Sequence, residues 1–178
     1  MINKRLLIKN LLSHNDENSF YDKKMKLSLT SKEGKGKFLK HICALSNSNP
    51  TNNSYIIIGI EDEENKIIGV DFFDDSKIQN LVNAYLKNPP KITYENVPFP
   101  SLPRHKVIGL VTIYYNSNIT SLLKNTWKYR KDTIFYRRGS NSMPASKNFE
   151  LRDTNKHSVD AIEKNANNNI KLTLDGVF

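Results

Sequence analysis

Three acidic residues, Glu17, Asp22 and Asp62, have the chemistry and the placement for metal-assisted catalysis. Glu17 and Asp22 flank a strand-like stretch, and Asp62 follows a continuous apolar run that is typical of a buried strand. Hard cations such as Mg²⁺ or Mn²⁺ prefer oxygen ligands, and a bound cation can activate water and stabilise charge on a scissile phosphate. The trio can meet only if the two strands are neighbours. The alternative is that "EDEEN" (residues 61–65) is acidic because it is an exposed turn.

The segment "LLKNTWKYRKDTIFYRR" (residues 122–138) has the composition of a nucleic-acid-binding surface. Its basic side chains are interleaved with four aromatic ones, and its single acid is Asp132. Cations neutralise phosphates, and aromatic rings stack on unpaired bases. The alternative is that the aromatic residues pack in a core while the lysines cover a solvated face. We expect phosphate contacts from the cations and from the turn that follows them: Lys128, Arg130, Lys131, Arg137, Arg138, Ser140 and Asn141.

Other kinds of reactive site have little support in the sequence. The four histidines are scattered, without the spacing of a zinc site, and no Gly-x-Ser-x-Gly motif occurs. "EGKGK" (residues 33–37) lacks the spacing of a phosphate-binding Walker loop. The lone Cys43 lies in a helical apolar pattern, where it is expected to be a small core residue.

The charge is unevenly distributed along the 178 residues, which carry a net charge of +9. Residues 90–178 hold 14 Lys and Arg against 7 Asp and Glu, a net of +7. This asymmetry favours a polyanionic partner such as nucleic acid, although a solvated basic surface would look the same. No apolar run is long enough to cross a membrane, and the N-terminal segment does not resemble a signal peptide. We therefore expect a cytoplasmic protein with no membrane contact.

Apolar periodicity predicts the elements that position these residues. Helices are expected over 2–12, 30–48 and 75–90, and strands over 18–29, 55–60, 66–70, 91–97, 106–115 and 133–139, with 66–70 as the hairpin partner of 55–60. This order predicts a single α+β domain with a mixed, mainly antiparallel sheet flanked by helices, over residues 1–151. Residues 152–178 are polar and Asn-rich, and they are expected to form a C-terminal extension, a partner-binding arm or a poorly ordered tail.

Four segments in this order resemble the Schlafen AlbA-type nucleic-acid-binding domain: "FLKHICALSNS", "YIIIGIEDEENKIIGVD", "HKVIGLVTIYY" and "IFYRRGSNSMPAS". The resemblance covers roughly residues 10 to 150 and implies an α+β module associated with DNA or RNA. RNA-cleaving Schlafen relatives use three acidic residues, which correspond here to Glu17, Asp22 and Asp62. The chain departs from the family pattern in two places. Asp22 stands where a Glu is usual, and "NPTNNS" (residues 49–54) replaces paired glycines.

Three functions remain open from the sequence. The first is a DNA- or RNA-binding module, such as a transcriptional regulator, that needs no cofactor for binding. The second is a metal-dependent endoribonuclease acting on structured RNA such as tRNA, with Mg²⁺ or Mn²⁺ held by the acidic trio. The third is a regulatory or structural protein whose basic tail and apolar helices bind a partner chain. The sequence also leaves open whether the chain forms a homo-oligomer.

Overall fold

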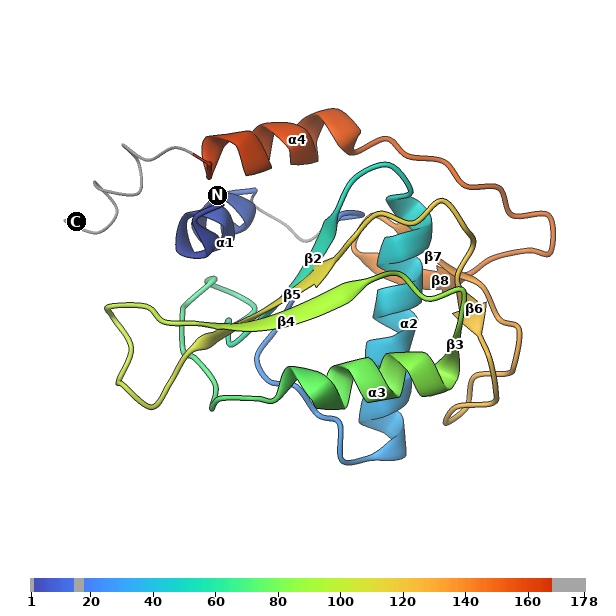
Figure 1. Ribbon diagram of the computed structural model, residues 1–178, viewed down its shortest axis with the longest axis horizontal. Helices are drawn as coiled ribbons and strands as arrows, with labels where there is room; N and C mark the ends of the chain where they lie inside the picture. The colour runs from blue at the N-terminus through green and yellow to red at the C-terminus, as the bar shows by residue number, and fades with distance from the viewer. Residues whose placement is uncertain (1, 15–17, 168–178) are drawn as a thin grey trace.

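A four-stranded sheet lies between two pairs of helices in the computed structural model, which describes residues 2–14 and 18–167 (Figure 1). The strand order is β1-β2-β5-β4, formed by β1 (Tyr21–Lys24), β2 (Ser54–Ile58), β5 (Ile108–Ile113) and β4 (Ile92–Val97). β1 runs parallel to β2, and the other two pairings are antiparallel. The predicted α+β class with a mixed, mainly antiparallel sheet is thus confirmed.

Each face of the sheet has its own hydrophobic core. Helices α2 (Lys32–Ser48) and α3 (Asp75–Tyr85) cover one face, and α1 (Lys4–Leu12) and α4 (Lys156–Asn165) cover the other (Figure 1). Along β2, Ile56 and Ile58 join the first core, whereas Tyr55 and Ile57 join the second. Successive strand residues point to opposite faces, so a strand buried on both sides is apolar throughout.

The three N-terminal helices begin where short polar side chains can cap them. The side chains of Asn3, Ser31 and Asp74 accept backbone N–H groups in the first turns of α1, α2 and α3. α2 starts at once after Ser31, although Gly34 and Gly36 lie in its first turns.

Residues 66–70 do not form the predicted hairpin strand. Only Ile67 pairs with Ile60, and Val70 pairs instead with Val107, each as an isolated bridge. The reason is that both edges of β2 are already occupied, by β1 and by β5, so a third strand has no place to bond.

Two short strand pairs lie outside the main sheet. β3 (Leu86–Lys87) pairs with β6 (Ser121–Leu122), and β7 (Phe135–Arg138) forms a hairpin with β8 (Asn141–Pro144). The β7–β8 hairpin packs against α2 (Figure 1). The strand predicted at the end of the series therefore exists, but it belongs to this hairpin.

The segment predicted as a polar extension contains α4. Val159, Ile162 and Ala166 of this segment are buried in the second core, beside α1. In the part of the chain that the structure describes, no helix combines the length and the apolarity needed to cross a membrane.

Candidate nucleic-acid interface

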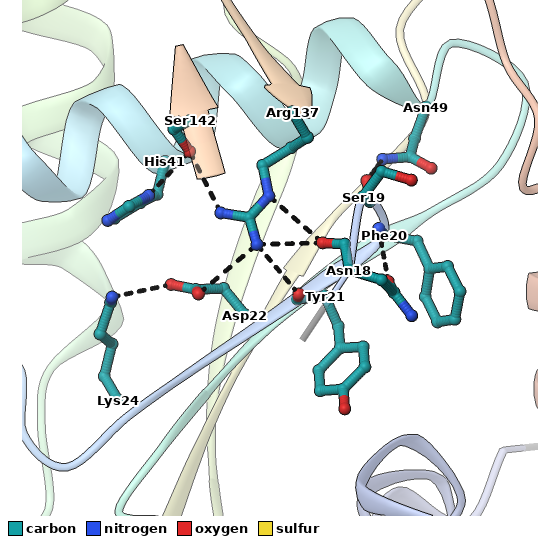
Figure 2. Close-up of polar contacts among 10 residues, drawn as sticks. All are labelled: Asn18, Ser19, Phe20, Tyr21, Asp22, Lys24, His41, Asn49, Arg137 and Ser142. Carbon is teal, nitrogen blue, oxygen red and sulfur yellow. Dashed lines mark hydrogen bonds and ion pairs between the residues drawn. The ribbon is translucent and has the colours of Figure 1, made fainter. Parts of the chain in front are cut away.

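Arg137 lies inside the molecule, where its guanidinium joins the β7–β8 hairpin to β1 (Figure 2). Its Nε and Nη2 donate to the carbonyl oxygen of Asn18 at 3.2 and 3.0 Å, and Nη2 also donates to the carbonyl oxygen of Tyr21 at 3.4 Å. Nη1 donates to Ser142 Oγ at 3.1 Å, and Nη2 lies 3.6 Å from Asp22 Oδ1. The Arg137 side chain is 0% exposed. It therefore lies where no phosphate on the surface can meet it, contrary to the prediction that it grips the backbone.

Strand alternation explains why the two adjacent arginines differ. Phe135 and Arg137 are buried, whereas Arg138 is exposed. The hairpin is fixed on α2 because Asn47 donates to the Phe135 carbonyl at 2.8 Å and Ser48 Oγ accepts from the Arg137 N–H at 2.8 Å. Side chains on a strand point alternately to opposite faces, so the residue next to Arg137 must face outward.

Asp22 is the buried carboxylate that faces Arg137. It lies in β1 and is 2% exposed. Its Oδ2 is 3.2 Å from Lys24 Nζ, and its Oδ1 is the atom nearest to the guanidinium. Two cations thus hold the orientation of this carboxylate from opposite sides (Figure 2).

A hollow of about 200 Å³ adjoins Asp22, between β1 and α2. Lys24, Lys37 and His41 bring polar groups to it, and Phe38 and Ile56 form part of its apolar wall. The hollow is therefore small and partly apolar, and both an acidic side chain and basic side chains line it.

His41 of this hollow is neutral. Burial lowers its pKa to about 3, with further lowering by Lys24, Lys40 and Arg137 against an opposing effect of Asp22. Nδ1 of His41 lies 2.9 Å from Ser142 Oγ. Because that hydroxyl accepts from Arg137, its proton is free to be donated to Nδ1, which leaves the His41 proton on Nε2.

The acidic trio is only partly placed by the described residues. Glu17 lies outside them. Asp22 lies in β1 and Asp62 follows β2, and these two strands are neighbours, as the trio requires, since β1 pairs with β2 and Gly59 N donates to the Lys24 carbonyl at 2.7 Å. Asp62 itself is exposed in the turn after β2 and does not line the hollow beside Asp22. Within residues 2–14 and 18–167, no three His, Cys, Asp or Glu side chains are grouped to hold a metal ion.

The remaining predicted contact residues are exposed. Residues 123–132 form a loop closed at its base by Leu122, which bonds through its N–H to the Thr133 carbonyl at 3.1 Å and through its carbonyl to the Asp132 N–H at 2.8 Å. The loop carries Lys128, Arg130 and Lys131. Ser140 lies in the turn between β7 and β8, and Arg138 and Asn141 are the strand residues on either side of that turn.

Sequence reasoning missed the contribution of α2. Lys37 Nζ lies 5.6 Å from the centre of the Trp127 ring, and Lys40 Nζ lies 5.6 Å from that of Tyr129. The lysines of "KEGKGKFLK" (residues 32–40) could have indicated that α2 adds to the basic surface. A comparison of this stretch with the Walker motif alone does not show that contribution. His41 and Ser142 give no local signal, because they are 101 positions apart and meet only in the fold.

The chain matches the family model described as Schlafen, AlbA_2 over residues 17–146. It therefore belongs to this Schlafen AlbA_2 family, as the resemblance of its motifs predicted. No curated protein matches the chain. Among solved structures, the chain is similar to the DIP2311 protein from Corynebacterium diphtheriae, with a TM-score of 0.50 and 14% sequence identity. That similarity covers 80% of this chain but only 27% of the DIP2311 chain, and it concerns the fold alone.

Proposed function

We propose that this member of the Schlafen AlbA_2 family binds the phosphate backbone of DNA or RNA through the loop 123–132 and the turn of the β7–β8 hairpin. The observation that carries the proposal is the exposure of Lys128, Arg130, Lys131 and Arg138 on these two segments. Exposed cations near phosphates release condensed counterions, which gives affinity without sequence preference. Membership of the family, whose members are nucleic-acid related, supports the same conclusion.

Salt dependence tests this proposal. Replacing Lys128, Arg130 and Lys131 together with Ala should weaken binding to an oligonucleotide. The slope of log K against log salt concentration should fall by roughly 0.7–0.9 for each phosphate that the protein no longer neutralises. The matched control replaces three exposed lysines of α1 and α4, namely Lys9, Lys156 and Lys164, which removes the same charge from the other side of the sheet. Equal slopes for the wild type and the loop variant would contradict the proposal.

A second candidate function is metal-dependent cleavage of structured RNA such as tRNA. The observation that favours it is the fixed Asp22 carboxylate, which adjoins a hollow with Lys24 and the neutral His41. Carboxylate oxygens suit Mg²⁺ or Mn²⁺, and a cation held by Glu17, Asp22 and Asp62 would supply charge stabilisation at a scissile phosphate. Among the described residues, Asp22 is the member of the trio that lines the hollow.

Incubation of the protein with a tRNA pool, with and without Mn²⁺, tests for cleavage. Asp62→Ala is the informative variant, because Asp62 is exposed and its loss should leave the fold intact. Glu63→Ala, in the same exposed turn, is its control. Metal-dependent cleavage that is lost in Asp62→Ala and kept in Glu63→Ala supports the trio, whereas cleavage that persists in both excludes it.

A further inference from the structure

Trp127 is the single tryptophan of the chain, and it lies partly exposed on the loop 123–132. Its exposed fraction is 38%, which is high for a large aromatic side chain beside a core. Inner contacts fix the ring. The indole and the Tyr129 ring form a T-shaped pair with ring centres 5.4 Å apart at 82°, and a Cβ added to Gly36 of α2 would lie 3.0 Å from Trp127 Cβ. The absence of a side chain at Gly36 lets the indole rest on the helix.

The backbone of Trp127 is unusual for a bulky residue. Thr126 and Tyr129 pair through two hydrogen bonds of 2.9 Å, so Trp127 and Lys128 form a two-residue turn. Trp127 occupies the first position of this turn with φ of +53°. Gly or Asn adopts that conformation easily, whereas a bulky side chain there is strained. Strained residues of this kind cluster at binding and catalytic sites.

Two lysine side chains lie over the Trp127 ring. Lys128 Nζ lies 4.5 Å from its centre, and Lys37 Nζ lies 5.6 Å from it. Next to the ring is a hollow of about 330 Å³, which is lined by Trp127 and Asn125 together with Lys32, Lys35, Tyr85 and Thr126. Glu33 neutralises part of this charge, because its carboxylate lies 2.9 Å from Lys37 Nζ.

We propose that Trp127 is a stacking platform for an unpaired nucleobase, with Lys37, Lys128 and the lysines of the adjacent hollow meeting the flanking phosphates. Aromatic rings within a cationic groove bind single strands in this way, since every base offers a stacking face. The bases of a regular duplex are already stacked on one another, so the preferred ligand is single-stranded nucleic acid or an unpaired loop. Lys37 lines the hollow beside Asp22 as well, so this side chain connects the Trp127 ring with that hollow.

This inference rests on the proposed function, and Trp127→Asn separates the two. Asn tolerates positive φ, so the turn can be kept, and thermal unfolding of the variant shows whether it stays folded without the indole contacts to Tyr129 and Gly36. Its affinity for a 12-nucleotide single strand should fall about five- to 150-fold, which corresponds to the loss of one stacked base. Its affinity for a duplex of the same sequence should stay unchanged.

Intrinsic fluorescence provides a second measurement, because all tryptophan emission comes from Trp127. Titration of the wild type with the single strand should quench this emission, and the duplex should quench it less. Lys37→Gln with Lys128→Gln should weaken single-strand binding and reduce its salt slope, and this variant keeps the test available if Trp127→Asn fails to fold.

The outcomes are distinguishable. If the wild type binds both oligonucleotides while Trp127→Asn keeps full single-strand affinity, or if the single strand leaves the fluorescence unchanged, the stacking platform is wrong and the phosphate-binding proposal survives. If neither oligonucleotide binds at low salt, both proposals fail. A blue shift of the emission with anionic phosphatidylserine vesicles, without any response to oligonucleotides, would assign the surface to membranes and overturn the inference.

Discussion

The pair formed by Asp22 and Arg137 is deeply buried, and the hydrogen bonds of Arg137 together with the nearby Lys24 offset part of its cost in desolvation. Removing a charge from water costs several kcal/mol, and the cost is recovered only where hydrogen bonds and an opposite charge meet it with good geometry. Arg137 has carbonyl oxygens, the Ser142 hydroxyl and the Asp22 carboxylate around it. Such a network holds the Asp22 carboxylate in one orientation, which is what a chemical role for this group would require.

Protonation of His41 should destabilise the fold. Burial holds the pKa of His41 at about 3, whereas an unfolded histidine titrates near its ordinary value of about 6.5. Below about pH 6.5, His41 binds a proton in the unfolded chain but stays unprotonated in the folded chain until the pH approaches 3. The stabilising contribution is therefore complete above roughly pH 7 and is lost as the pH falls from about 6.5 toward 3. Linkage predicts that the free energy of unfolding falls by about 1 kcal/mol between pH 7 and pH 5.5 from this group.

Urea denaturation of the wild type and of His41→Asn at both pH values checks this expectation. Asn places a polar atom near the position of Nδ1, so contact with Ser142 can be retained without a titrating ring. The variant should lose less stability than the wild type over this range. The same loss in both proteins would assign the pH dependence to other groups.

The sequence shows which side chains are charged, but it does not show which of them are exposed. In the sequence, Arg137 and Arg138 look like one basic pair. Phe135 and Arg137 are two positions apart on a strand and therefore share one face, which is a signal that Arg137 points inward with Phe135. A charged residue is rarely fully buried without a partner, however. The partner, Asp22, is 115 positions away in the sequence, so only the fold could identify it.

Among the elements, α2 organises the candidate site. His41 of this helix lines the hollow beside Asp22, and Lys37 lies over the Trp127 ring. Asn47 and Ser48 bond to the β7–β8 hairpin. Glycine weakens a helix, so on propensity alone the two glycines in the first turns of α2 would delay its start. The observed start is instead directly after Ser31, since the cap stabilises the first turn and the glycines give space to neighbouring chain.

Gly34→Ala should destabilise the protein although Ala is the better helix former. A Cβ at Gly34 would lie 1.8 Å from the carbonyl oxygen of Ser28, a backbone atom that cannot move alone. Helix propensity favours Ala by about 1 kcal/mol, and steric overpacking of this kind costs typically about 1–3 kcal/mol. We expect the clash to prevail, with a lower midpoint of chemical denaturation. Lys32→Ala, at an exposed position of the same turn, should change stability by less than about 0.5 kcal/mol. A more stable Gly34→Ala variant would show that the Ser28 segment relaxes freely.

At the scale of the whole molecule, the two cores differ in how visible they are in the sequence. The core between the sheet and α2 and α3 follows from strong apolar periodicity. The core on the other face is shared by α1 and α4, and the polar composition of the segment that holds α4 led to the prediction of an extension from residue 152. Val159, Ile162 and Ala166 are buried in this core together with Leu7, Ile8 and Leu11 of α1. A short apolar stripe in an Asn-rich segment is a weak signal for a packed helix. The contacts with α1 and with Tyr55 of β2, which show that this helix belongs to the fold, are visible only in the structure.

Contacts of α4 show why the fold should depend on it. Tyr55 of β2 donates its hydroxyl proton to the Glu163 carboxylate, and Asn53 Nδ2 donates to the same oxygen at 3.0 Å. The Ala166 carbonyl accepts the N–H of Asn3, the residue that caps α1, at 2.9 Å. α4 therefore fixes both the face of the sheet and the start of α1, although it lies outside the region matched by the family model.

A chain ending at residue 151 should accordingly be much less stable than the full chain, because one face of β2 and one side of α1 would be exposed to water. Ile162→Ala tests the same contact without truncation, and loss of a buried Ile side chain costs typically about 2–5 kcal/mol. The exposed Lys164→Ala on the same helix is the control and should change stability by less than about 0.5 kcal/mol. Chemical denaturation followed by circular dichroism measures all three proteins.

If the chain ending at residue 151 unfolds at the same midpoint as the full chain, the domain boundary predicted at residue 151 is correct and α4 is a dispensable extension. If its midpoint falls together with that of Ile162→Ala, the domain continues through α4.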